Sequence, residues 1–206
     1  MYGNVEEAQR ILRKYTDLDS SLLTNFLNEA TIQVIELIST PIIGELVSYN
    51  SNLNRVKVAN QYIADINGDK TIDSNDVLVQ YMDSNNQLHS ITVSSVDSEL
   101  GYIYISDSIP TGVKVFATYR YYSKKPDWNE IDRLATLIAV EKYILSEILL
   151  LPDRWKAGGF SYSIDKSNIL KILEKEIHTI LSKYVSGGVA DIDFSYERKD
   201  NYKVEK

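Results

Sequence analysis

The residues best suited to chemistry are concentrated in one acidic loop, residues 65–76. Oxygen-bearing side chains occupy loop positions one, three, five, nine and twelve, and the backbone carbonyl of position seven completes the set: Asp65, Asn67, Asp69, Asp73, Asp76 and Thr71. Calcium is a hard cation that takes six to eight oxygen ligands, and alternating Asp and Asn side chains point theirs inward from a curling backbone. The spacing therefore predicts a structural calcium ion in this loop.

This acidic loop resembles the calcium-binding loops of EF-hand proteins, and more closely those of dockerins, with Ile72 as the apolar anchor. Lys70 departs from the pattern, because glycine normally makes the sharp turn there and a left-handed backbone at lysine costs ~1–2 kcal/mol. A strand pattern, Val77 to Tyr81, follows the loop where a dockerin has a helix. The alternative interpretation is a hydrated turn between two strands that holds no metal.

No catalytic arrangement accompanies the loop. The chain has no cysteine, which excludes disulfides, zinc thiolate sites and a cysteine nucleophile. The two histidines, His89 and His178, lie far apart in the pattern, and no Ser/His/Asp order, glycine-rich phosphate loop or HExxH helix occurs. We therefore expect that the protein is not an enzyme.

Composition and charge favour a soluble globular protein. The 206 residues are 44% hydrophobic and 25% charged, and the formal net charge is −7. This acidic balance argues against tight binding of nucleic acid, which needs clustered Lys and Arg. The first residues lack a signal-peptide pattern, and the most apolar run, Ile144 to Leu151, is short and contains Glu147. We expect no membrane contact.

Helical patterns at both ends of the chain flank a strand-like middle. Apolar residues recur at three- and four-residue steps from Asn4 to Tyr49 and from Asp127 to Val185, with Asp19 or Ser20 and Asp127 as N-caps. Between them, valine, isoleucine and tyrosine pairs alternate in about five strands. The predicted fold is α+β, a helical bundle built from the N- and C-terminal segments with an inserted small antiparallel β domain.

The domain limits follow from these patterns. We assign residues 1–50 to N-terminal helices, 51–124 to the inserted β domain with its acidic loop, 125–187 to C-terminal helices and 188–206 to a flexible tail. The helix after Asp127 is apolar around much of its circumference, so it is expected to be central.

Four residues are candidates for an interface. Arg154 and Trp155 lie in the predicted loop after Pro152, where an aromatic and an arginine have no core to fill. Phe194 and Tyr196 lie in the C-terminal tail, which either becomes ordered on a partner, by strand addition for example, or stays disordered. The alternative for Arg154 and Trp155 is that they cap the helix ends.

The two ends of the chain resemble the head–tail adaptor (connector) proteins of tailed viruses. The N-terminal likeness covers residues 5–23, 27–30 and 34–35, in which a short helix leads into a longer one that starts with an acidic turn. Residues 131–139 are similar to the alanine-rich central helix of that family, and residues 159–163 to its glycine, aromatic and serine connection. The long strand-rich middle departs from the minimal all-helical adaptor.

The resemblance implies a structural virion protein located in the neck, between capsid and tail, and made in the host cytoplasm. Such a protein forms a ring, a dodecamer, beneath the portal protein, extends the DNA channel without binding DNA specifically, and provides a platform for the tail or a tail-completion protein. Two alternatives remain open: a calcium-dependent protein- or glycan-binding module that uses the acidic loop, and a tail-completion or neck protein of the same build.

Overall fold

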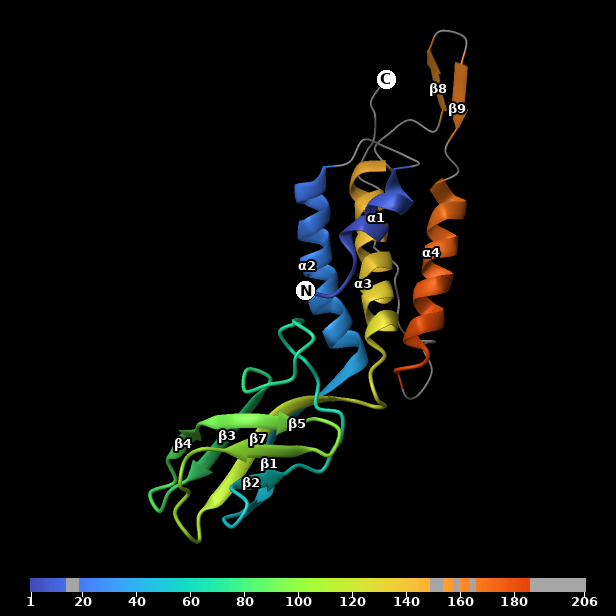
Figure 1. Ribbon diagram of the computed structural model, residues 1–206. Coiled ribbons are helices and arrows are strands. Elements are labelled where there is room, and N and C mark those ends of the chain that lie inside the picture. The colour runs from blue at the N-terminus through green and yellow to red at the C-terminus, as the bar shows by residue number, and fades with distance from the viewer. Residues whose placement is uncertain (14–18, 149–153, 158–159, 164–165, 186–206) are drawn as a thin grey trace, which may run out of the picture.

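The structure is a computed structural model that describes residues 1–13, 19–148, 154–157, 160–163 and 166–185 (Figure 1). Its helices are α1 (Val5–Leu12), α2 (Ser20–Ile38), α3 (Trp128–Tyr143), which continues into a π-helix (Ile144–Ile148), and α4 (Lys166–Leu181). Its strands are β1 (Ser39–Asn50), β2 (Arg55–Lys57), β3 (Val77–Met82), β4 (Leu88–Ile91), β5 (Val93–Asp97), β6 (Tyr102–Ile105), β7 (Lys114–Tyr122), β8 (Arg154–Ala157) and β9 (Phe160–Ser163).

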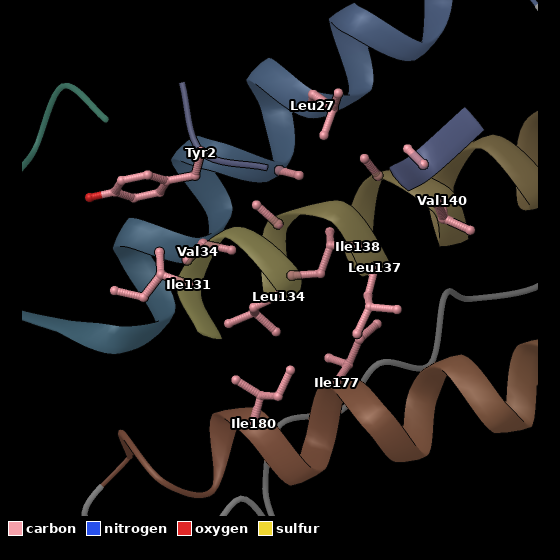
Figure 2. Packing of buried hydrophobic residues seen from close by; sticks show 14 of the residues in the cluster. Tyr2, Leu27, Val34, Ile131, Leu134, Leu137, Ile138, Val140, Ile177 and Ile180 are labelled. Carbon is pink, nitrogen blue, oxygen red and sulfur yellow. The ribbon is translucent and has the colours of Figure 1, made fainter. Parts of the chain in front are cut away.

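Helix α3 lies between the other helices, with α2 and α4 on opposite sides of it (Figure 1). Side chains from α2, α3 and α4, together with Tyr2 from the N-terminal segment, meet in one hydrophobic cluster (Figure 2). Within α3, every residue from Leu134 to Glu141 is buried, so no side of the helix in this stretch faces solvent. The N- and C-terminal segments therefore share a core, and the central position expected for this helix is confirmed.

The predicted N-caps of α2 and α3 are present. The Asp19 carboxylate accepts hydrogen bonds from the backbone N–H groups of Ser21 and Leu22, at 2.8 and 3.1 Å. Asp127 accepts those of Asn129 and Glu130 in the same way at the start of α3. Each cap satisfies N–H groups that have no partner within the helix.

The middle of the chain forms one seven-stranded antiparallel sheet in the order β4-β3-β7-β1-β2-β6-β5. The sheet is nearly closed on itself, because β5, at one edge, also contacts β3 near the other. It has its own hydrophobic core, built by inward-facing residues such as Val79, Ile103, Val115 and Ala117. All seven strands lie to one end of the helices (Figure 1).

The predicted helical bundle with a small inserted β domain is therefore wrong. The protein is α+β, but a seven-stranded, nearly closed sheet dominates it, and that sheet contains more strands than the five expected. The main error lies in residues 39–50, which we assigned to the N-terminal helices and which form β1, the longest strand.

The sequence of β1 explains why this segment is not helical. Pro41 has no N–H and would disrupt a helix, whereas its place in β1 is tolerated because β1 pairs there with β7 alone. The register between the two strands shifts between Ile42 and Glu45, and Gly44, with φ +66°, lies at this bulge. Apolar residues at i and i+3 in this segment match the spacing expected of a helix, but the proline and glycine favour a bulged strand.

We predict that the core position Ile131 is far more sensitive than a surface isoleucine. Ile131→Ala removes a side chain that is fully buried in α3 and should lower the free energy of unfolding by about 2–5 kcal/mol. The matched control is Ile172→Ala in α4, because Ile172 is 58% exposed and should change stability by less than about 1 kcal/mol. Urea unfolding followed by circular dichroism measures both, and equal effects would contradict the packing described.

Candidate functional site

The acidic loop connects β2 to β3 and packs against the helices. The charged N-terminus of Met1 donates a hydrogen bond to the Gly68 carbonyl, and the Lys70 ammonium lies 2.7 Å from the carboxylate of Asp132 in α3. A methyl group at Gly68, where φ is +74°, would lie only 2.5 Å from the side chain of Thr31 in α2. The loop is therefore part of the junction between sheet and helices.

Asp65, the first residue of the loop, is completely buried and closes the turn on itself. Its two carboxylate oxygens accept the backbone N–H groups of Gly68 at 2.7 Å and Lys70 at 2.6 Å. Lys70 has φ +69°, the left-handed backbone that the loop spacing requires at this position. These charge-assisted hydrogen bonds help to offset the cost of that conformation in a non-glycine residue.

Asp76, the last residue of the loop, is also buried. Its carboxylate accepts the N–H groups of Ile66 at 2.7 Å and Asp73 at 2.9 Å. Burial raises the pKa of Asp76, the two N–H donors oppose this shift, and the nearby charge of Asp65 adds to it. The first and last residues of the predicted calcium site are thus brought close enough to repel each other.

The remaining candidate ligands form exposed turns. The Asn67 side chain accepts the N–H of Asp69 at 2.9 Å, Asp69 accepts that of Thr71 at 2.7 Å, and Asp73 accepts that of Asn75 at 2.7 Å. Each is a local turn in which a side chain replaces a backbone acceptor two residues away.

The donor types suit calcium, but the described geometry does not assemble a metal site. Within the described part of the chain, no three acidic or histidine side chains converge so that they could hold an ion. The carboxylate oxygens instead accept backbone N–H groups of their own loop. Calcium binding by the residues of the acidic loop therefore stays a prediction.

The sequence did not indicate that Tyr2 and Tyr122 would meet at this junction. Their hydroxyls lie 3.0 Å apart, and the Tyr2 hydroxyl donates to the Asp65 carbonyl at 3.2 Å. Burial raises the pKa of both tyrosines. The Trp128 ring packs beside both rings, at centroid distances of 6.0 and 6.3 Å. No local pattern links residues so distant in the chain.

A second feature that we did not predict is a basic depression on the outer face of the sheet. Its volume is about 510 Å³. The residues that matter for its chemistry are Ser48, Tyr49, Asn50, Arg55, Lys57 and Tyr102. The Arg55 guanidinium lies 3.8 Å from the centre of the Tyr102 ring, and the Lys57 ammonium lies 4.5 Å from it. The available signal was the two-residue spacing of Arg55 and Lys57, which places both on one face of a strand.

The structure places the candidate interface residues only in part. The backbone of Arg154 and Trp155 belongs to β8, where Trp155 pairs with Tyr162 of β9, so the prediction of a loop at these two residues was wrong. Phe194 and Tyr196 lie outside the described residues. An interface role for the four residues stays a prediction.

A further buried acid lies among the helices, at Glu141. It lies in α3, one turn before the π-helix, and only 7% of it is exposed. Burial raises its pKa to about 7, the charge of Glu174 adds to the shift, and Lys142 opposes it.

Comparison with known proteins adds no assignment. No protein-family model matches this chain, and no curated protein matches it. Among the described residues, no helix is both long and apolar enough to cross a membrane.

We predict that calcium raises the melting temperature of the protein. A ligand that binds only the folded state stabilises it by about 2.7 kcal/mol at a concentration one hundred times its dissociation constant. Differential scanning fluorimetry with Ca²⁺, Mg²⁺ or chelator measures the shift, and Asp69→Asn, which keeps the side chain's size, should reduce it. If calcium leaves the wild-type midpoint unchanged, the loop is a hydrogen-bonded turn without a metal.

We also predict that Glu141→Gln stabilises the protein at neutral pH. From pH 4.5, the ordinary pKa, to about 7, the folded state keeps a proton that the unfolded state has lost, so stability falls as pH rises. Above pH 7 the variant should gain up to about 3 kcal/mol, and below pH 4 it should gain little. The control is Glu36→Gln on exposed α2 surface, and urea unfolding at several pH values compares the two slopes.

Proposed function

We propose that this chain is a structural virion protein, a head–tail adaptor that assembles into a ring beneath the portal of a tailed virus. The observation that carries the proposal is the shared core of the two chain ends. The segments whose order resembles the adaptor family are α1 and α2 near the N-terminus and α3 and α4 nearer the C-terminus. Helices α1, α2 and α4 pack around α3 as a common unit.

The helices also offer two different surfaces to neighbours. Ile32 of α2 is 61% exposed and Ile172 of α4 is 58% exposed, and these helices lie on opposite sides of α3 (Figure 1). A ring subunit needs two unlike faces that meet head to tail, because a single self-complementary patch gives a closed pair instead. The two exposed isoleucines suit the first arrangement.

The charge of the chain agrees with a channel through which DNA moves. A net charge of −7 gives no large attraction for phosphates, so DNA would pass without being retained. The proposed partners are therefore the portal protein, further copies of this chain and a tail or tail-completion protein.

The predicted outcome is a ring when the purified protein is mixed with its cognate portal and imaged by electron microscopy. The double variant Ile32→Asp/Ile172→Asp should keep its fold, because both side chains are exposed, but should not form the ring. The matched control replaces two other exposed residues, Leu53→Asp/Leu88→Asp, and should assemble normally. A wild-type protein that does not associate with the portal would contradict the proposal.

A further inference from the structure

The two cations of the basic depression are held together without an acidic partner. In the described part of the chain, neither Arg55 nor Lys57 forms an ion pair, although the chain contains 29 Asp and Glu residues against 22 Lys and Arg. The nearest acid by strand register, Asp97, pairs with Tyr102 and accepts the N–H of Leu100 instead. Two like charges beside one ring repel each other, and an anion would relieve that repulsion.

The sheet fixes both cations in place. Lys57 pairs with Tyr102 across β2 and β6, and its ammonium also donates a hydrogen bond to the Leu100 carbonyl. Arg55 lies two residues before Lys57 on the same face of β2, and its guanidinium stacks on the Tyr102 ring. Stacking uses the flat face of a guanidinium and leaves its N–H edge available for a carboxylate.

We propose that the basic depression binds an acidic segment of a partner protein, with a carboxylate between Arg55 and Lys57. A depression of about 510 Å³ is large enough for a few residues rather than a single ion. Hydroxyl and amide side chains of Ser48 and Asn50 line it and can bond a peptide backbone.

A protein partner fits this surface better than a nucleic acid. The guanidinium of Arg55 covers the Tyr102 ring, so that face is not available for a base to stack on. Two cations are also few for phosphate binding in a chain of charge −7. Leu53, in the turn between β1 and β2 beside the depression, is 52% exposed, and arginine, tyrosine and exposed apolar side chains together are typical of protein interfaces. This inference does not depend on the adaptor proposal.

The test uses the full chain and three fluorescent probes in an anisotropy titration. The probes are a short peptide rich in Glu that also contains Leu and Tyr, the same peptide with every Glu replaced by Gln, and a single-stranded oligonucleotide of similar charge. We expect the Glu peptide to bind most tightly and its affinity to fall with salt. Arg55→Gln/Lys57→Gln should weaken it by about tenfold or more, which is the loss expected when a paired charge is removed.

The matched control is Lys171→Gln/Lys175→Gln, which removes two exposed lysines of α4, away from the depression, and should leave the affinity within about twofold. Arg55→Lys keeps the charge but loses the planar edge, so an intermediate loss of about threefold is expected and still tests the site if the double variant does not fold. Equal binding of the Glu and Gln peptides, tighter binding of the oligonucleotide, or the same loss in the control variant would overturn the proposal.

Discussion

The rest of the structure depends on the burial of α3 on every side. Eight consecutive residues, Leu134 to Glu141, are buried, which spans more than two helical turns and leaves no polar side in this stretch. No single neighbour can cover such a helix, so α1, α2 and α4 must pack around it together. The two ends of the chain are therefore brought to the same place, and the sheet must leave and rejoin the helices at one point.

That point is held by a set of polar contacts as well as by packing. Ser39 at the start of β1 pairs with Tyr122 at the end of β7, so the strands that leave and enter the helices are neighbours. Tyr122 then contacts Tyr2, and the acidic loop joins the junction through Lys70 and Asp132. Because the loop contacts α2 and α3 directly, a cation bound in the loop would stabilise the junction between sheet and helices. This placement agrees with a structural role for the cation better than with a signalling one.

The sequence predicted the features that local chemistry determines. The caps at Asp19 and Asp127 and the strand after the acidic loop each depend on a few adjacent residues, and each is present. Residues 39–50 were misassigned because their apolar spacing suits a helix as well as a strand, and the long pairing of β1 with β7 decides between them.

The Tyr2–Tyr122 contact and the stacking of Arg55 on Tyr102 could not be predicted for a related reason. Each joins residues that only the strand register or the helix packing brings together. A register shift of one residue between β2 and β6 would place Lys57 and Tyr102 on opposite faces of the sheet.

The location of the basic depression makes the two proposals compatible. Ser39, at the start of β1, adjoins the helices, whereas Asn50, at its other end, lines the depression. A twelve-residue strand separates these points by up to about 37 Å. Contacts between copies through Ile32 and Ile172 would therefore bury the helical flanks and leave the depression accessible. In such a ring every copy would present its Arg55 and Lys57 at an equivalent position. An acidic partner could then bind several copies at once, although each single contact is weak.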